Sequence, residues 1–312
     1  ALFDQSSFVK LLVSGAGAEA LLQRLCAADV AVAPGAVVYT QMLNGAGGIE
    51  SDLTVARLSG SEYYLVSGTA MAVHDSGHIR RNTLGSDRVT VVDVTSAFGV
   101  LGLMGPRSRS ILQRLAEGNL AKEEFPYRAV REVMVAGAPV RMMRLSYMGE
   151  LGFELHVPTE YLLTVFDALH AEGREHGLVN AGYRAIDSLR LEKQFCSWGA
   201  EIGPDETPLE AGLAFAVAFG KGDFIGREAL VRQRKMPLAK SLATFAVDSD
   251  TPLLGGETIY RDDQVCGWIT SGGYGHTIGQ PLGRDLQHVR YAQVRLCLLM
   301  QVGLSFWLCW CR

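Results

Sequence analysis

Two carboxylates share one face of a predicted strand in the first quarter of the chain. Residues 49–55 follow a glycine-rich turn, and their side chains largely alternate between apolar and polar types. Because successive side chains of a strand point to opposite faces, Glu50 and Asp52 share one face, whereas Leu53 and Val55 share the other. Leu53 and Val55 mark the buried face. Spacing alone therefore favours a solvated outer face for the two acids.

A second predicted strand, 151–157, has the same arrangement. Phe153 and Leu155 point one way, whereas Glu154 and His156 point the other way. Glycines lie beside Glu154, and a carboxylate next to glycines on a strand can approach a flat ligand closely. Spacing alone again favours a solvent-facing acid.

The composition is that of a folded globular protein. The 312 residues are 48% apolar and 20% charged, which is enough chain for two or three packed units. The net charge is −4 and no dense stripe of Lys and Arg is visible, which argues against nucleic-acid binding because phosphate neutralisation needs clustered cations. The uncharged run 296–311 is shorter than the roughly 20 residues of a membrane helix, so no membrane anchor is expected.

The cysteines and histidines do not indicate a metal site. The six cysteines show neither metal-ligand spacing nor a disulfide framework, and the histidines form no H-E-x-x-H pair. A reducing intracellular compartment fits this cysteine usage best. No targeting peptide is visible, but the sequence begins almost inside a predicted strand, so targeting cannot be read from it.

An internal repeat organises the first half of the chain. Residues 11–25, "LLVSGAGAEALLQRL", align with residues 101–115, "LGLMGPRSRSILQRL", at an offset of 90 residues. Each segment reads as a strand, a glycine turn and an amphipathic helix. A third strand and helix follow at 152–173, and a helical stripe lies at 185–193. This pattern predicts an α+β fold of split βαβ type.

The C-terminal third has a different texture. From about Ser241, short alternating runs are separated by Gly and Asp turns, which indicates a small all-β domain. We expect two repeated units at about 1–95 and 96–240, an incomplete β-barrel-like domain at 241–283, and an atypical apolar tail at 284–312.

Residues 15–20, "GAGAEA", match the dinucleotide fingerprint G-x-G-x-x-A. The equivalent turn of the second copy contains Pro106 and Arg107, which exclude a close approach to a pyrophosphate. In addition, Pro34 and Gly35 fall inside the next candidate strand. We therefore interpret these glycines as parts of a strand-to-helix turn.

Four long segments resemble the aminomethyltransferase family, which includes the glycine-cleavage T-protein. They are "VYTQMLNGAGGIESDLTVARL", "RLSYMGELGFELHVP", "NAGYRAIDSLRLEKQFCSWGAEIGPDETPLEAGLAF" and "KGDFIGREAL". The likeness is strongest to the tetrahydrofolate-binding C-terminal half of sarcosine and dimethylglycine dehydrogenases, and it covers residues 2 to about 283. The resemblance implies a cloverleaf of two related α+β units and a β-barrel-like third domain around a folate pocket.

The resemblance also implies roles for individual residues. In the family, the aspartate that matches Asp52 sits beside the reactive nitrogens of tetrahydrofolate, and the glutamate that matches Glu154 binds the pterin ring. Asp52 is therefore the expected catalytic residue, and Glu154 the expected pterin anchor. Further positions where the family lines or abuts the pocket are Tyr39, Val66, Tyr147 and Trp198. Arg184 is a further expected folate-binding residue.

Two departures from the family pattern affect the expected function. The T-protein has an arginine near the folate tail where this chain has Ile186, although Arg184 lies two residues earlier. This difference favours the dehydrogenase-like branch. The flavin domain that would oxidise the amine is not in this sequence, so FAD is expected only with a further N-terminal domain.

The leading hypothesis is tetrahydrofolate-dependent transfer of a methylene group from an amine-derived iminium or formaldehyde. The partners would be folate, a small one-carbon donor and a flavin oxidoreductase domain or subunit. The location would be the mitochondrial matrix in a eukaryote and the cytoplasm in a bacterium. Two alternatives stay open: a free-standing glycine-cleavage aminomethyltransferase, and a non-catalytic folate-binding or regulatory subunit or fragment.

Overall fold

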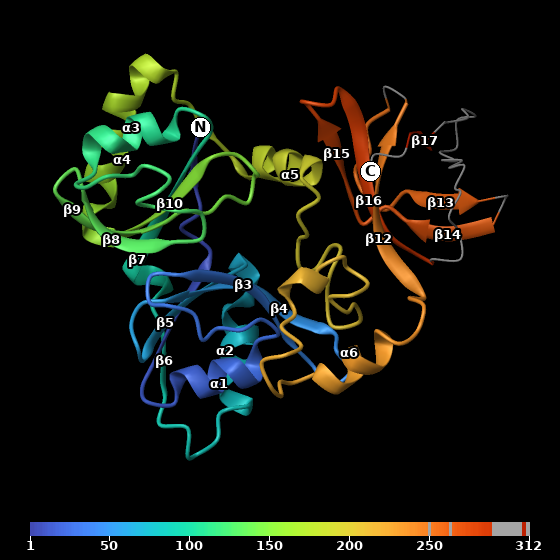
Figure 1. The fold of residues 1–312 in the computed structure, drawn as a ribbon. Coiled ribbons are helices and arrows are strands. Elements are labelled where there is room, and N and C mark those ends of the chain that lie inside the picture. The colour runs from blue at the N-terminus through green and yellow to red at the C-terminus, as the bar shows by residue number, and fades with distance from the viewer. Residues whose placement is uncertain (249–250, 262–263, 289–307, 310–312) are drawn as a thin grey trace. The chain divides into compact units, whose positions relative to one another are not determined.

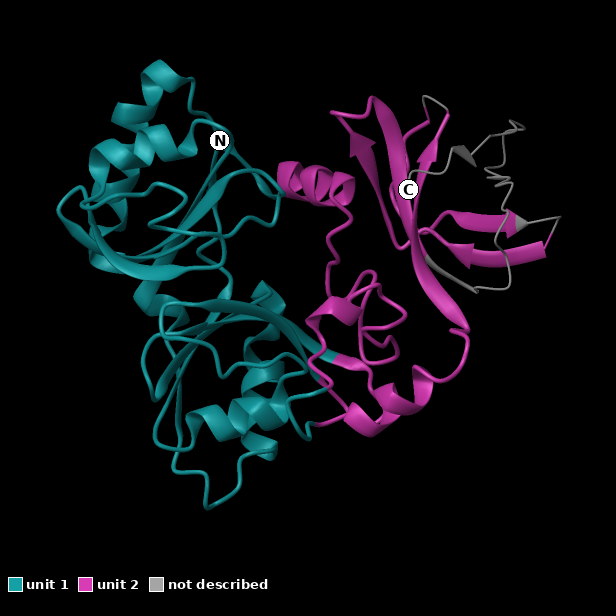
Figure 2. Ribbon diagram, in the orientation of Figure 1, with its two compact units in different colours: residues 1–42, 50–183, 220–224 teal, residues 43–49, 184–219, 225–312 magenta. Residues whose placement is uncertain are grey.

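The chain forms two compact units, which Figure 2 shows in different colours. The computed structural model describes residues 1–248, 251–261, 264–288 and 308–309. Unit 1 comprises residues 1–42, 50–183 and 220–224, and unit 2 comprises residues 43–49, 184–219 and 225–312. Helices and strands are interspersed along the chain (Figure 1), and the strands form several sheets. This arrangement confirms the predicted α+β class.

The first sheet of unit 1 has five strands in the order β3-β4-β5-β2-β6. Its strands are β2 (Val9–Ser14), β3 (Val37–Leu43), β4 (Ile49–Arg57), β5 (Glu62–Ser67) and β6 (Thr90–Asp93). The associated helices are α1 (Ala18–Leu25), the short turn η1 (Thr69–Met71) and α2 (Ala72–Arg81). In α1, Leu21, Leu22 and Leu25 are fully buried, as their helical spacing predicts.

The second sheet of unit 1 has six strands in the order β11-β1-β7-β10-β9-β8. Its strands are β1 (Leu2–Asp4), β7 (Phe98–Met104), β8 (Val130–Val135), β9 (Ala138–Met143), β10 (Gly152–Pro158) and β11 (Asn180–Ala181). The helices are α3 (Ser108–Leu115) and α4 (Leu162–Gly173), with short turns η2 (Thr95–Ala97), η3 (Thr159–Tyr161) and η4 (Arg174–His176). Side chains of α3 and α4 pack with one face of β7 and β10 in a single hydrophobic core.

The predicted repeat is confirmed at the level of hydrogen bonds. The amide of Gly15 donates to the carbonyl of Ser61, and the amide of Gly105 donates to the carbonyl of Leu151, again 90 residues apart. The strand orders also correspond, β3-β4-β5-β2-β6 to β8-β9-β10-β7-β1. The fifth strand of each set is exchanged between the halves, because β1 from the N-terminus pairs with β7 of the second sheet and β6 pairs with β2 of the first.

The glycines of the "GAGAEA" turn are explained by packing of the chain against itself. A Cβ atom on Gly15 would lie 2.2 Å from the carbonyl oxygen of Arg88, and one on Gly17 would lie 1.7 Å from that of Asp87. Gly15 also has φ of +128°, which favours glycine. These glycines therefore admit the neighbouring loop at 87–88, in agreement with the interpretation of a structural turn.

The two sheets of unit 1 face each other across a shared apolar layer. Val37, Ala56 and Tyr64 of the first sheet pack with Val130 and Met143 of the second. Helices cover the opposite face of the second sheet. Side chains on the facing surfaces are consequently shielded from water by a sheet on either side.

Besides residues 43–49, unit 2 contains most of helix α5 (Tyr183–Glu192), η5 (Ala214–Ala216) and α6 (Arg227–Gln233). Its strands are β12 (Lys240–Val247), β13 (Thr258–Arg261), β14 (Gln264–Trp268), β15 (Ser271–Gly275), β16 (Gln280–His288) and β17 (Leu308–Cys309). The predicted short strands after Ser241 are confirmed. Within the described residues they form a sheet in the order β15-β16-β12-β17 and a β13-β14 hairpin, without a closed barrel.

The predicted apolar tail is described only in part. Its first residues, 284–288, belong to strand β16, and residues 308–309 form β17. Residues 289–307 and 310–312 of the predicted tail lie outside the described part of the chain. Among the described residues, no helix has the length and apolar character needed to span a membrane.

The explanation for Gly17 predicts a specific sensitivity to substitution. We expect Gly17→Ala to reduce the free energy of unfolding by about 1–3 kcal/mol, because the new methyl group forces the loop at 87–88 to move. Chemical denaturation measures this change. Gly60→Ala is the matched control, since no atom lies within 4 Å of a Cβ built there. Equal stability of the two variants would contradict the packing explanation.

Candidate functional site

Asp52 lies on β4, and neighbouring strand β3 supplies its hydrogen-bond donors. From Ile49 to Val55, buried and partly exposed residues alternate, so the predicted division of the two faces over 49–55 is confirmed. The side-chain amide of Gln41 donates to Asp52 Oδ1 at 2.9 Å. The hydroxyl of Tyr39 also hydrogen-bonds the Asp52 carboxylate. Tyr39 and Asp52, which the family resemblance assigns to one site, are therefore in contact.

The environment of Asp52 raises its proton affinity. Burial raises the pKa of Asp52 to about 6, whereas the hydrogen bonds from Tyr39 and Gln41 lower it. The nearby carboxylate of Asp75 raises the pKa further. Asp52 is thus not on a solvated outer face. A carboxyl group with a pKa near neutrality can both accept and release a proton at physiological pH.

Asp75 belongs to a polar cluster between α2 and β4. Its side chain is buried, and Ser67 Oγ donates to Asp75 Oδ2 at 2.5 Å. His74 lies between two carboxylates, with Nδ1 3.4 Å from Asp75 Oδ1 and Nε2 3.1 Å from Glu50 Oε2. Burial raises the pKa of Asp75. The carboxylates of Asp75 and Glu50 are therefore each held by a neighbouring polar side chain.

Val66 extends the same face of the first sheet. It pairs in register with Thr54 of β4 and with Lys10 of β2, so these three side chains form one row across the sheet. Lys10 is fully buried, and its Nζ donates to the carbonyl of Ser6 at 2.7 Å. Burial lowers the pKa of Lys10 to about 8. Val66 is partly buried and packs against the apolar layer between the sheets.

Glu154 lies on β10 of the second sheet, between Gly102 of β7 and Met143 of β9. Its side chain is 14% exposed, and its Oε2 lies 3.8 Å from Nε2 of the fully buried His156. His156 Nδ1 lies 3.1 Å from the hydroxyl of Tyr64 on the first sheet. Burial lowers the pKa of His156, so its neutral form is favoured.

The Tyr64–His156 contact connects the facing surfaces of the two sheets. Glu154 shares its face of β10 with His156, and Asp52 shares its face of the first sheet with Val66. Both acids therefore belong to the two surfaces that pack on each other. Tyr147, in the loop between β9 and β10, is partly buried in the same unit.

Trp198 and Arg184 belong to unit 2, so the structure describes them separately from Asp52 and Glu154. Trp198 is partly buried, and its indole Nε1 donates to the carbonyl of Ile49 at 2.9 Å. Arg184 is exposed in the first turn of α5, whereas Ile186 is buried.

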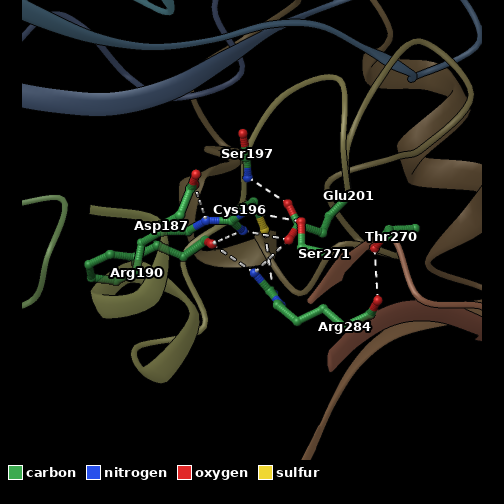
Figure 3. Close-up of polar contacts among 9 residues, drawn as sticks. Asp187, Arg190, Cys196, Ser197, Glu201, Thr270, Ser271 and Arg284 are labelled. Atoms are coloured by element: carbon green, nitrogen blue, oxygen red, sulfur yellow. Dashed lines mark hydrogen bonds and ion pairs between the residues drawn. The ribbon is translucent and has the colours of Figure 1, made fainter. Parts of the chain in front are cut away.

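A buried ion-pair cluster holds the loop that carries Trp198 (Figure 3). Arg190 of α5 contacts Glu201 at 2.5 Å and donates to Ser271 Oγ of β15 at 2.9 Å. The other oxygen of Glu201 accepts the amide of Ser197 at 2.8 Å. Arg284 of β16 donates to the carbonyl of Phe195 at 2.8 Å. The cluster thus ties the loop at 195–201 to both α5 and the C-terminal sheet. Removal of one buried partner would leave an uncompensated charge.

Three side chains of this region were not predicted from the sequence. Gln41 and Asp75 tune Asp52, and His156 lies beside Glu154. The alternation along 151–157 already placed His156 on the face of Glu154. No sequence signal indicated Asp75, because its effect on Asp52 arises from tertiary packing. Among the described residues, no group of three His, Cys, Asp or Glu side chains could hold a metal ion.

Comparisons with known proteins agree with this fold. The GCVT N-terminal domain model matches residues 1–221, and the glycine cleavage T-protein C-terminal barrel domain model matches residues 240–293. The chain therefore belongs to the GCVT aminomethyltransferase family. The crystal structure of the glycine cleavage system aminomethyltransferase T from Bartonella henselae is similar, with a TM-score of 0.84 and 26% sequence identity, over 94% of this chain and 79% of that chain.

Two curated relatives differ in how much of their length is matched. Mitochondrial sarcosine dehydrogenase from mouse is 43% identical over 299 residues, which are 90% of this chain and 32% of the relative. Aminomethyltransferase from Caldanaerobacter subterraneus is 34% identical over 294 residues, which are 94% of this chain and 78% of the relative. The chain thus spans about a third of the length of the sarcosine dehydrogenase that it resembles.

The raised pKa of Asp52 predicts a measurable effect on stability. Folding favours the protonated carboxyl, so the associated stability is present below about pH 4 and is lost as the pH rises through about 6. Asp52→Asn is neutral at every pH. We expect this variant to exceed the wild type in free energy of unfolding by about 1–3 kcal/mol at pH 7.5 and to match it near pH 4.

Chemical denaturation at the two pH values measures this difference. Asp167→Asn, which neutralises an exposed carboxyl on α4, is the control and should change the stability little at either pH. A variant with no pH-dependent gain over the wild type would show that Asp52 is not destabilised by burial.

Proposed function

We propose that this protein carries out tetrahydrofolate-dependent transfer of a one-carbon unit at the methylene oxidation level. The donor would be an amine-derived iminium or formaldehyde. The observation that carries the proposal is the Asp52 carboxyl, which is partly buried between two sheets, oriented by Tyr39 and Gln41, and given a pKa of about 6. Membership of the aminomethyltransferase family supports a folate as the acceptor.

The side chains around Asp52 and Glu154 fit a pterin ring. Gln41 is fully buried, and its Oε1 has no hydrogen-bond partner among the described residues, so it can accept a ligand N–H. The Glu154 side chain is partly exposed. Adjacent N–H donors on the edge of a pterin can bond to a carboxylate as a pair, and such charge-assisted bonds are stronger than neutral ones. Glu154 is the proposed anchor.

Bound tetrahydrofolate would supply the nucleophilic nitrogens that accept the one-carbon unit. Asp52 would stabilise positive charge that develops beside it, because a fixed carboxylate needs no reorganisation at the moment of reaction. With a pKa of about 6, the same carboxyl group would take up and release a proton at Oδ. Tyr39 and Gln41 would hold it in place, and the facing sheets would limit the access of water.

The length of the sarcosine dehydrogenase relative supports a modular role. Since this chain matches about a third of that protein, we propose that it works with a flavin oxidoreductase domain or subunit, where any FAD would bind. Within this chain we propose a folate-binding region at 1–240 with a smaller C-terminal domain after it. Val66, Tyr147, Trp198 and Arg184 are proposed as further folate contacts. The compartment would be the mitochondrial matrix in a eukaryote and the cytoplasm in a bacterium.

A second candidate is a free-standing aminomethyltransferase of the glycine-cleavage type. The favouring observation is that the chain covers 78% of the Caldanaerobacter subterraneus aminomethyltransferase. Activity with an aminomethylated lipoyl carrier protein, without activity towards formaldehyde, would support this candidate. The opposite result would support the dehydrogenase-like module.

The proposed role of Asp52 predicts a separation of binding from turnover. We expect Asp52→Asn to keep the tetrahydrofolate Kd within about tenfold of the wild type, while the transfer rate falls by on the order of 10²-fold or more. Isothermal titration calorimetry and single-turnover assays with formaldehyde measure the two quantities. Equal losses in affinity and rate would exclude a mainly transition-state role. Absence of binding by the wild type would exclude the proposed function.

The proposed role of Glu154 as the pterin anchor predicts a larger effect on tetrahydrofolate binding than on turnover. Glu154→Gln should weaken tetrahydrofolate binding about 10- to 100-fold, the usual value of a hydrogen bond to a charged group, with a smaller effect on the rate at saturation. Glu150→Gln is the matched control, because Glu150 is exposed in the loop before β10. If both variants bind like the wild type, Glu154 is not the anchor.

A further inference from the structure

The internal repeat places Arg57 and Arg144 at equivalent positions. The carbonyl of Arg57 accepts the amide of Gly35, and the carbonyl of Arg144 accepts the amide of Arg128. Arg57 Nη1 donates to the carbonyl of Val32 at 2.8 Å, and Arg144 Nη1 donates to that of Phe125 at 2.7 Å. Both pairs of partners lie 93 residues apart. The two guanidinium groups therefore share this Nη1 contact. Arg57 also donates from Nε to the carbonyl of Ser59 at 3.2 Å and from Nη2 to that of Gly60 at 3.3 Å.

The helices that follow the glycine turns also correspond residue by residue. The amide of Ala18 donates to the carbonyl of Gly15, and the amide of Ser108 donates to that of Gly105. At the other end of each helix, the amides of residues 26 and 116 donate to the carbonyls of residues 22 and 112. Since the offset is 90 residues throughout, Glu19 of α1 corresponds to Arg109 of α3.

In the first repeat, a carboxylate neutralises the arginine. Glu19 Oε2 lies 2.7 Å from Arg57 Nη2 and accepts the hydroxyl of Tyr63 at 3.2 Å. In the second repeat, Arg109 replaces Glu19 and Phe153 replaces Tyr63. The Arg109 difference removes the carboxylate and adds a second positive charge. The Phe153 difference removes the hydroxyl that donates to the carboxylate in the first repeat.

The guanidinium groups of the second repeat keep unused hydrogen-bond donors. Arg144 is 9% exposed, and its Nε has no partner among the described residues. Nε and Nη2 of the half-buried Arg109 are also buried without a partner in that part of the chain. Burial and the positive charge of Arg109 lower the pKa of Arg144, whereas Glu123 raises it. Glu123 itself is exposed. Buried charges without partners are costly, so this arrangement is incomplete by itself.

We propose that Arg109 and Arg144 bind a small oxyanion, a phosphate or carboxylate group, at the place that the Glu19 carboxylate fills in the first repeat. Guanidinium groups bind both anions through paired N–H donors. The site is distinct from the candidate folate site. Phe153, which corresponds to the Tyr63 of the first repeat, packs in the helix-covered core of the second sheet, whereas Glu154 lies on the opposite face.

Thermal unfolding of the whole chain tests this proposal, with inorganic phosphate and acetate as probes and chloride at matched ionic strength as reference. We expect saturable stabilisation of the wild type, with a rise in Tm of about 2–4 °C near saturation. Saturation by phosphate alone identifies a phosphate site, and saturation by acetate identifies a carboxylate site. Absence of a saturable rise with both probes overturns the proposal.

Arg109→Glu restores the pairing of the first repeat. We expect this variant to have a higher Tm than the wild type without added anion and to lose the anion-dependent rise. Arg107→Glu is the matched control, because it makes the same charge change at an exposed position at the start of α3, and it should keep the anion response. Equal behaviour of the two variants overturns the proposal.

Two further variants keep the test decisive if Arg109→Glu does not fold. Arg109→Met should lose the anion response, because one of the two cations is removed. Glu123→Gln should keep or strengthen the response, because it removes a carboxylate whose charge acts on Arg144. A wild-type-like response in Arg109→Met, or loss of the response in Glu123→Gln, contradicts an external anion as the partner.

Discussion

The carboxyl group of Asp52 lies where two β-sheets of one unit face each other, and this position sets its chemistry. Burial raises the pKa of Asp52 to about 6, and the carboxylate of Asp75 acts in the same direction. Hydrogen bonds from Tyr39 and Gln41 oppose the shift and orient the group. The protein therefore carries an energetically unfavourable charge at neutral pH, which the surrounding fold must stabilise. Such strain is common where a side chain is used for proton transfer.

A duplicated framework supports an asymmetric site. The same backbone hydrogen bonds build both halves of unit 1, and the same strand order recurs in both sheets. The side chains differ where chemistry is expected. Glu154 corresponds to Tyr64 of the first half, and the neighbouring His156 corresponds to Val66. The contact between Tyr64 and His156 then joins positions that are not symmetry-related. The repeat thus supplies the scaffold, and divergence supplies the acids.

The sequence predicted the elements of the site better than its energetics. Alternation along β4 and β10 assigned the faces of Asp52 and Glu154, because a buried strand face needs apolar residues at every second position. The repeat and the structural role of the "GAGAEA" glycines also followed from spacing. Spacing alone, however, favoured a solvated face for Asp52. That interpretation was wrong because the outer face of β4 is covered by the second sheet, a long-range arrangement that no local pattern encodes.

Contacts between distant segments account for the rest of what sequence reasoning missed. Asp75 approaches Asp52 from helix α2, and His156 meets Tyr64 from another sheet. In unit 2, the cluster of Arg190, Glu201 and Arg284 joins helix α5 and the loop that follows it to the distant strand β16. Each of these contacts depends on how elements pack, whereas sequence patterns report mainly how an element forms.

The most direct measurement of the central claim is the titration of the Asp52 carboxyl carbon by ¹³C NMR, assigned with the Asp52→Asn variant. The account predicts a midpoint near pH 6 in the ligand-free protein, and a higher midpoint in Tyr39→Phe, because that substitution removes a hydrogen bond to the carboxylate. A midpoint near pH 4, unchanged in Tyr39→Phe, would show that Asp52 is an ordinary solvated acid and would contradict the account.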